Sequence, residues 1–166
     1  MPTLPTLFAA VLSSFLACHA AAADLPSASK DPAVSSHFAT GPFEVKLAPQ
    51  PLSPEAARSG IGRMSLDKQF HGALEAASTG EMLAFGDPGS GSAGYVAMER
   101  VRGTLDGLAG SFVLQHSSTL SQGVPTQSIT VVPGSGTDAL AGLSGRLVVE
   151  IAPGGAHSYR FDYTLP

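Results

Sequence analysis

Two ionisable side chains in the middle of the chain could carry out proton transfer together. Glu99 and His116 lie on either side of Asp106-Gly107, a dipeptide that favours the centre of a two-residue type I′ hairpin turn. A register in which Leu105 pairs with Leu108 makes Glu99 and His116 diagonal neighbours, within side-chain reach of each other. A carboxylate beside an imidazole could shuttle a proton, because burial and pairing can move both pKa values toward neutrality.

The same register divides the predicted hairpin into two faces. The face that carries the pair is mostly apolar and aromatic, and its other residues are Tyr95, Ala97, Val101, Phe112 and Leu114. We expect this face to point into the protein, with Arg100 and Arg102 outside. A structural interpretation stays open, because a buried Glu–His contact often only satisfies two core polar groups. A shift of the register by one residue would turn Glu99 to solvent.

Three further side chains are candidates for contact with a ligand. Lys68 alternates in phase with Leu66 and Phe70 and would share their side of a strand. Tyr95 lies on the same hairpin face as Glu99 and would add a phenol. The last candidate belongs to an alternating stripe of His157, Tyr159, Phe161 and Tyr163, in which Tyr159 is the residue of interest. Such a stripe is also typical of core packing with a histidine at the rim.

Spacing argues against a metal or phosphate site. Beyond the N-terminal residues the histidines are His37, His71, His116 and His157, and they lie too far apart for the short ligand spacings of a metal centre. The run Gly134-Ser135-Gly136-Thr137 lacks the lysine and helix of a phosphate-binding loop, and Ser135 lacks the setting of a catalytic nucleophile. We therefore predict a loop between strands at this run, and neither a metal nor a cofactor.

Short β-strands must position these residues. Alternating apolar and polar positions predict strands at 43–47, 64–77, 82–86, 95–105, 108–117, 127–132, 146–151 and 157–165. In this interpretation Gly72 bends the second strand, and Ser78-Thr79-Gly80 forms the turn after it. A single helical turn is expected at 53–58, with Ser53 as its N-cap and Pro54 at its first position. Eight short strands favour an all-β fold, a single antiparallel closed barrel without exposed edges.

The N-terminal residues resemble an export signal. Residues 7–17 form an apolar stretch too short to span a bilayer, and Ala21 and Ala23 supply the small residues that precede a cleavage site. We predict a signal peptide at 1–23, a flexible leader at 24–36 and the barrel domain at 37–166, in a protein that is periplasmic or secreted. The alternative is a lipoprotein anchored through Cys18, the one cysteine of the sequence. Neither form has a membrane-spanning segment in the mature chain.

The charge balance excludes one class of partner. The 166 residues include 9 Lys and Arg against 13 Asp and Glu, which gives a net charge of -4. The basic residues form no cluster, whereas nucleic acids and anionic lipids attract clustered Lys and Arg. We therefore expect no nucleic-acid partner.

Three runs in the second half of the chain match a family pattern in their order and spacing. They are GYVAMERVRGTLDGLAGSFVLQH, VVPGSGTDALAGLSG and HSYRFDYTL. Together they resemble the bacterial domain-of-unknown-function family 3224 (DUF3224), and the resemblance extends from Phe43 to the C-terminus. It implies an eight-stranded barrel similar to those of allene oxide cyclase and the plant dirigent proteins. It implies no activity.

Three hypotheses for the function follow. The first is a non-enzymatic barrel that binds a small, largely apolar molecule in its interior. The second is an isomerase or cyclase in which Glu99 and His116 transfer protons, by analogy of fold with allene oxide cyclase. The third is a structural or protein-interaction module with a functional outer surface. A lumen filled by Phe70, Phe112, Tyr159 and Phe161 would remove the basis of the first two. The sequence leaves open whether the protein is an enzyme and whether it forms oligomers.

Overall fold

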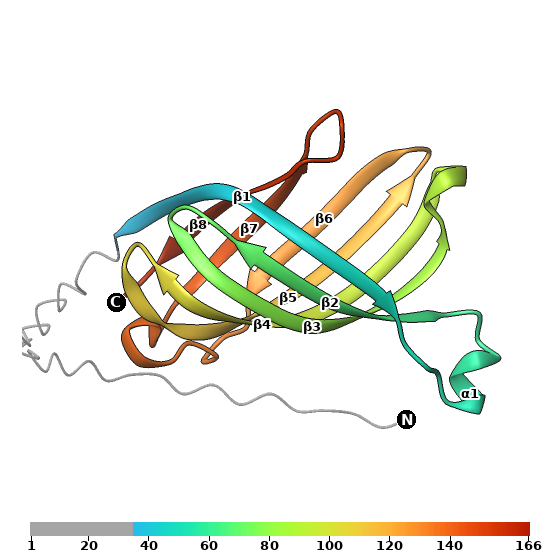
Figure 1. Cartoon of the computed structure of the whole chain (residues 1–166), viewed down its shortest axis with the longest axis horizontal. Helices are drawn as coiled ribbons and strands as arrows, with labels where there is room; N and C mark the ends of the chain where they lie inside the picture. Colours follow the sequence, from blue (N-terminus) through green and yellow to red (C-terminus); the bar gives the residue numbers. More distant parts are fainter. Residues whose placement is uncertain (1–34) are drawn as a thin grey trace, which may run out of the picture. The chain divides into compact units, whose positions relative to one another are not determined.

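Apolar and polar residues alternate along the strands, and a sheet that closes on itself buries the apolar face. The computed structural model describes residues 35–166. Within them eight antiparallel strands follow one another around a closed barrel, with β8 pairing with β1 (Figure 1). The strands are β1 (Ser36–Pro49), β2 (Gly62–Phe70), β3 (Leu74–Asp87), β4 (Ser92–Leu105), β5 (Leu108–Ser121), β6 (Val124–Val131), β7 (Ser144–Ile151) and β8 (His157–Thr164). The predicted all-β closed barrel is confirmed, whereas the predicted signal peptide, Cys18 and the leader up to residue 34 lie outside the described residues.

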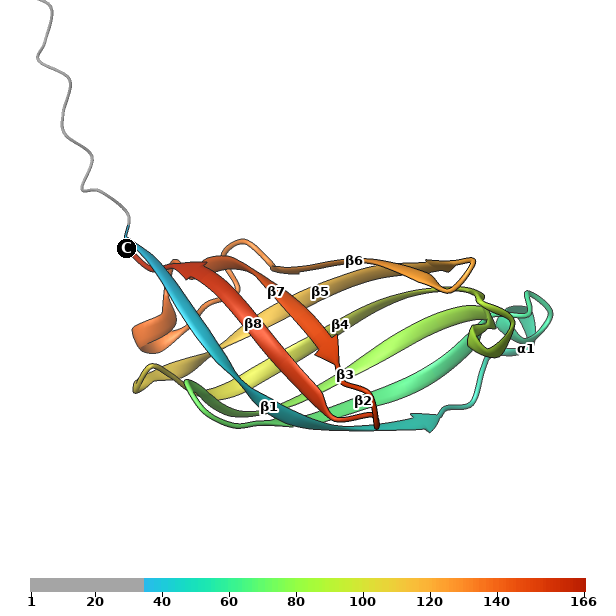
Figure 2. The same cartoon turned by 90° about the horizontal axis from the view of Figure 1, so that it is seen from above.

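The connections between strands gather at the two ends of the barrel. The β2–β3, β4–β5 and β6–β7 connections lie at one end, termed the closed end, and the other four lie at the opposite, open end (Figure 1). Strands β1 and β8 cross the barrel obliquely, as closure requires (Figure 2). The β1–β2 connection includes the predicted helical turn, α1 (Pro54–Ala57), and the Ser53 side chain caps it by accepting from the backbone N–H of Ala56. Short 3₁₀ turns, η1 (Pro88–Ser90) and η2 (Asp138–Leu140), lie in the β3–β4 and β6–β7 connections.

The β4–β5 hairpin has the predicted turn and register. Asp106 and Gly107 have φ angles of 48° and 81°, the positive values that a type I′ turn requires. Leu105 pairs with Leu108. The residues between 95 and 116 to which this register assigns a face therefore lie on the predicted faces of the sheet.

The predicted turn between the second and third strands is wrong. β2 ends at Phe70 and the chain reverses at residues 71–73, so that Ser78, Thr79 and Gly80 lie within β3. Gly72 permits this reversal because its φ is +97°, and a Cβ there would lie 2.8 Å from the Thr40 carbonyl oxygen. The turn keeps the apolar positions in phase on both sides, and the pattern therefore resembles one continuous strand.

The β6–β7 connection forms hydrogen bonds with the part of β5 that has no partner residues in β6. The Ser135 hydroxyl accepts from the backbone N–H of Val113 at 3.0 Å, and the Thr137 hydroxyl accepts from that of Ser111 at 3.0 Å. The run at 134–137 is thus a loop, as predicted, and its hydroxyls satisfy the part of β5 that extends beyond β6. Leu140, the last residue of η2, is buried.

The junction of β6 and β7 is held partly by a side chain. Two residue pairs link these strands directly. Beyond them the Gln127 side chain donates to the carbonyl of Val149 at 3.0 Å and accepts from its N–H at 2.9 Å. The amide of Gln127 thereby replaces a missing step of the backbone ladder.

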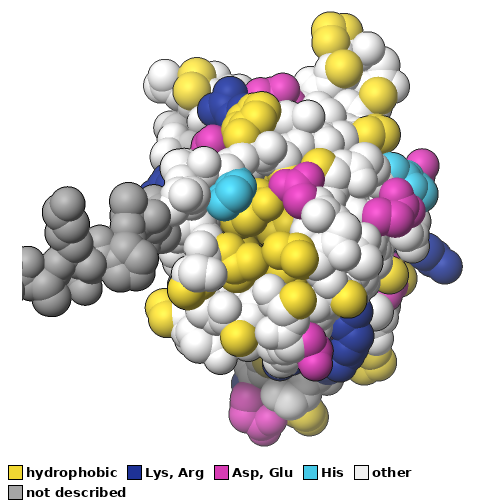
Figure 3. Space-filling model, turned by 90° about the vertical axis from the view of Figure 1, so that its left-hand side faces the viewer, with side chains coloured by type: hydrophobic (Ala, Val, Ile, Leu, Met, Phe, Trp, Pro, Cys, Tyr) yellow, Lys and Arg dark blue, Asp and Glu magenta, His cyan; other side chains and the backbone are white. Residues whose placement is uncertain are grey.

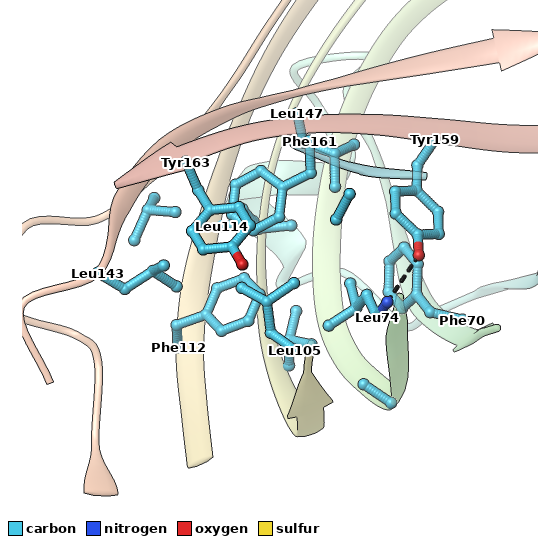
Figure 4. Close-up of a cluster of buried hydrophobic side chains, with 14 of the residues drawn as sticks. Phe70, Leu74, Leu105, Phe112, Leu114, Leu143, Leu147, Tyr159, Phe161 and Tyr163 are labelled. Atoms are coloured by element: carbon cyan, nitrogen blue, oxygen red, sulfur yellow. Dashed lines mark hydrogen bonds between the residues drawn. The ribbon is translucent and has the colours of Figure 1, made fainter. Parts of the chain in front are cut away.

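Large side chains fill the half of the barrel next to the closed end, termed the closed half; the other half is termed the open half. Those buried in the closed half include Leu140 and the residues labelled in Figure 4, among them Phe70, Leu74, Leu105, Phe112, Leu143, Tyr159, Phe161 and Tyr163. The ring centroids of Phe112 and Phe161 lie 5.8 Å apart in a stacked arrangement, and those of Phe70 and Tyr159 lie 5.6 Å apart edge to face. Figure 3 looks onto this end of the barrel, where apolar side chains gather at the centre. The closed half is therefore a packed core.

The two buried tyrosines of this core have partners for their hydroxyls. The Tyr159 hydroxyl accepts from the backbone N–H of Leu74 at 2.8 Å (Figure 4) and donates to the carbonyl of His71 at 3.1 Å. The Tyr163 hydroxyl donates to Asp106 at 2.5 Å. Each hydroxyl secures a turn at the closed end to β8, because His71 and Asp106 belong to the β2–β3 and β4–β5 turns.

Candidate functional site

Four polar side chains meet inside the barrel at the boundary of the packed core. Lys68 on β2, Ser78 on β3, Glu99 on β4 and His116 on β5 come from consecutive strands and are all buried, Glu99 to 1% exposure. Lys68 pairs directly with Ser78 across β2 and β3. The contacts of Ser78 and His116 with Glu99 are diagonal between neighbouring strands, whereas Lys68 reaches Glu99 across β3. These four residues are referred to as the interior polar cluster.

Glu99 is the centre of the interior polar cluster. Its Oε1 atom lies 2.7 Å from Nζ of Lys68 and 2.8 Å from Nε2 of His116, and its Oε2 atom accepts from the Ser78 hydroxyl at 2.5 Å. An ionised carboxylate only accepts hydrogen bonds, and Nε2 of His116 therefore carries the proton in this contact. The cluster satisfies the buried carboxylate with three donors.

The interior polar cluster strongly favours the ionised form of Glu99 over the protonated form. Burial by itself would raise the pKa of Glu99, but the hydrogen bond from His116 and the positive charge of Lys68 outweigh burial and lower the pKa to about 2. A carboxylate with such a pKa is a weak base near neutral pH. Glu99 is therefore suited to hold Lys68 and His116 in place rather than to accept a proton.

A glycine lets the neighbouring strand approach Glu99 closely. Gly80 on β3 pairs with Glu99. A Cβ at Gly80 would lie 2.7 Å from Cα of Glu99 and would also collide with the carbonyl oxygen of Met98. The absence of a side chain at this position therefore helps to bring β3, with Ser78, against the Glu99 carboxylate.

An internal cavity begins where the interior polar cluster ends. It has a volume of about 430 Å³ and extends toward the open end. Its walls are mostly apolar, with Phe43, Val45, Leu66, Met82, Ala97 and Val149 among them. Lys68, His116, Tyr95 and His157 also line this inner cavity, whereas Glu99 does not. The carboxylate thus lies behind the lysine and the histidine, away from the space that a ligand could enter.

A second, outer cavity continues from the inner one to the mouth of the barrel. Its volume is about 550 Å³, and it shares Leu47, Met82, Pro88, Tyr95 and Ile151 with the inner cavity. The residues that line it include no Asp, Glu, Lys, Arg or His. Polarity therefore decreases from the interior polar cluster to the mouth.

The structure brings together three of the five side chains singled out from the sequence. Glu99, His116 and Lys68 are in direct contact, and Tyr95 lines the cavity beside them. Burial raises the pKa of Tyr95 against the opposing effect of a hydrogen bond with Ser118, so its phenol keeps its proton. Tyr159 lies apart, within the closed half, where its hydroxyl binds backbone groups.

Ser78 is the member of the cluster that sequence reasoning missed. Its assignment to a turn removed it from the interior, although Leu74, Ala76 and Ser78 alternate on one face of β3. The inner cavity also contains His157 at its rim, with its ring centroid 5.2 Å from that of Phe43. That position agrees with the predicted rim histidine.

The outer surface of the barrel carries a separate apolar patch. Leu83, Phe85, Val96 and Met98 are exposed on β3 and β4, and a shallow depression of about 600 Å³ lies over part of them. Arg102 is exposed on the same outer side of β4, as predicted, and Arg100 is half-buried. The interaction-module hypothesis would use this surface.

Within residues 35–166, no group of three or more His, Cys, Asp and Glu side chains is arranged to hold a metal ion. Among the same residues, no helix has the length and hydropathy needed to cross a lipid bilayer.

Comparison with known proteins identifies the family. The family model described as a protein of unknown function, DUF3224, matches residues 39–163. No curated protein matches the chain. The crystal structure of a protein with unknown function from the DUF3224 family of Shewanella oneidensis MR-1 is similar, with 44% sequence identity and a TM-score of 0.72, over 80% of this chain and 99% of that one. The matched region is the barrel that holds the interior polar cluster, and the chain belongs to the DUF3224 family.

Proposed function

We propose that the open half of the barrel binds a small, largely apolar molecule. The observation that carries this proposal is the inner cavity of about 430 Å³, which has apolar walls and a few convergent polar groups at its base. Pockets for small molecules commonly have volumes of about 300–1,000 Å³ and this kind of lining. The strands around the cavity belong to a closed ladder, so binding would require little rearrangement of the backbone.

Native mass spectrometry of the protein, isolated gently from the cells that produce it, tests this proposal. We expect an excess mass that disappears under denaturing conditions. Val149→Trp would fill the inner cavity and should abolish the excess. Glu150→Trp adds the same side chain to the exposed outer side of β7 and should retain it. A wild-type protein without excess mass, or an excess that Val149→Trp leaves unchanged, contradicts the proposal.

A catalytic role for His116 is the second candidate. Glu99 fixes the imidazole through Nε2, and the ring lines the inner cavity. A carboxylate that orients a histidine toward a substrate is a common arrangement for general base catalysis. In this version Glu99 positions the ring and His116 transfers the proton, because the pKa of Glu99 is about 2.

Hydrogen exchange distinguishes catalysis from simple binding. The co-purifying molecule is incubated with the protein in deuterated water and analysed by mass spectrometry. Proton transfer predicts deuterium at a carbon atom of the molecule, and its loss in His116→Gln. A molecule that retains all its carbon-bound hydrogens identifies the barrel as a binding protein only.

Export from the cytoplasm is also part of the proposal. Its support is the apolar stretch at 7–17, followed by Ala21 and Ala23. The mass of the mature protein tests it. A chain that starts at Asp24 indicates cleavage after Ala23, a lipid on Cys18 indicates a lipoprotein, and an intact N-terminus overturns export through a cleaved signal.

A further inference from the structure

We infer that the ligand is a carboxylate with an apolar body, bound with its carboxylate at the interior polar cluster and its apolar end toward the mouth. This inference rests on the proposed binding function and adds the chemical class and the orientation of the ligand. Its basis is the distribution of ionisable groups along the two cavities.

The ionisable groups at the base of the inner cavity are neutral or positive. They are the ammonium of Lys68 and the imidazole of His116, and the other ionisable groups of this cavity are the imidazole of His157 at its rim and the phenol of Tyr95, which the outer cavity shares. The residues that line the two cavities include no Asp or Glu. Glu99 lies on the far side of Lys68 and His116, where it offsets the charge of Lys68 without facing the ligand space. An anionic group is therefore the natural partner for this end.

Lys68 has the capacity to bind such a group. Its hydrogen bond to Glu99 uses one of three N–H donors. The ammonium also lies 5.3 Å from the ring centroid of Phe43 and 5.5 Å from that of Phe70, and these cation–π contacts are weaker than a bond to a carboxylate. Tyr95 keeps its proton and can supply a second donor.

The outer cavity determines the orientation of the ligand. Because none of its lining residues carries a charge, a charged head group there would lose hydration without gaining a partner. An apolar chain that moves from water into the outer cavity loses no favourable hydration. A carboxylate at the base and an apolar body toward the mouth satisfy both cavities at once.

Isothermal titration calorimetry with four ten-carbon probes tests the inference on the full mature protein. The probes are decanoate, methyl decanoate, 1-decanol and decylamine, which share the chain and differ in the head group. We expect decanoate to bind at least about tenfold tighter than the neutral probes, a typical effect of a charge-assisted contact. Decylamine should bind most weakly, because its charge repels that of Lys68.

A matched double variant assigns the preference to the cluster. Lys68→Met combined with Glu99→Gln removes both charges together and leaves no buried charge without a partner. The ratio of the affinities for decanoate and methyl decanoate should fall to about one, while methyl decanoate binds as before. Circular dichroism verifies that the variant keeps its strands, and Tyr95→Phe provides a smaller change that should reduce the ratio partly.

The outcomes separate the two proposals. Neutral probes that bind as tightly as decanoate overturn the carboxylate inference and leave apolar binding intact. Tight binding of decanoate that survives in the double variant also overturns it, since the anion then binds elsewhere. Failure of all four probes overturns both the inference and, together with an absent native mass excess, the proposed function.

Discussion

The closed and open halves of the barrel follow the same alternation of inward and outward residues, yet one is solid and the other is hollow. In the closed half, the ring of Phe161 on β8 meets those of Phe112 on β5 and Tyr163 on β8 itself. In the open half the inward positions include Val45, Ala97 and Val149, and a cavity of about 430 Å³ remains. The alternation decides which residues point inward, and their volumes decide whether the interior closes.

The halves also treat buried polar atoms differently. In the closed half, Tyr159 and Tyr163 bind turns and thereby stabilise the fold. At the boundary, the interior polar cluster places an ion pair beside a cavity. Buried ion pairs often contribute little net stability compared with apolar packing. Their presence beside a cavity, rather than within the packed core, is therefore what suggests a functional role.

The largest expected effect is the loss of an aromatic ring from the closed half. Phe161→Ala should lower the free energy of unfolding by about 3–5 kcal/mol, because the ring is fully buried among aromatic neighbours. Val149→Ala in the open half should cost only about 1 kcal/mol, because its side chain already borders a cavity. Urea unfolding at neutral pH measures both, and equal losses would contradict the distinction between a solid and a hollow half.

Acid should destabilise the folded protein by protonating Glu99, at the boundary between the closed and open halves. The pKa of Glu99 in the folded protein is about 2, below its ordinary value of 4.5. The stability linked to this carboxylate is therefore complete above pH 4.5 and is lost as the pH falls toward 2. The shift corresponds to about 3 kcal/mol. Unfolding measured across this range should show a weaker pH dependence in Glu99→Gln, while Phe161→Ala should keep the slope of the wild type.

A smaller effect is expected at the junction of β6 and β7. Gln127→Ala removes two hydrogen bonds to the backbone of Val149 and should cost about 1–2 kcal/mol. Hydrogen exchange at the Val149 amide should accelerate, because this N–H loses its acceptor. Unchanged exchange would indicate that backbone pairing extends across this position without the side chain.

The smallest expected effect is a loss of stability at alkaline pH, caused by deprotonation of Tyr163 in the closed half. Burial, with a hydrogen bond to Asp106, raises the pKa of Tyr163 to about 12, from an ordinary value of 10. Stability linked to the protonated phenol is present below pH 10 and is lost as the pH rises toward 12. Tyr163→Phe should reduce this alkaline loss by less than about 1 kcal/mol. The free energy of unfolding is measured against pH for both proteins. A difference between variant and wild type that stays constant up to pH 12 would contradict this assignment.

Local chemistry explains which parts of the fold could be predicted. Asp106 and Gly107 specify a two-residue turn, and the turn then sets the partner of every residue in β4 and β5. The diagonal contact between Glu99 and His116 therefore follows from the sequence of one hairpin. The turn at residues 71–73 has no such signature, because the alternation continues in phase through Gly72. The pattern consequently predicts a turn at Ser78, and its contact with Glu99 does not emerge from the sequence.

The sequence by itself determined the alternation along the strands, the closed antiparallel barrel and the inward direction of Lys68, Glu99 and His116. These features depend on patterns within a strand or across one short turn. Only the tertiary structure decided that Lys68 and His116 meet at the same carboxylate oxygen of Glu99, that the closed half is full and that the open half is hollow. The physical reason is that packing depends on the combined volumes of side chains from strands far apart in the chain, and no local pattern contains that sum.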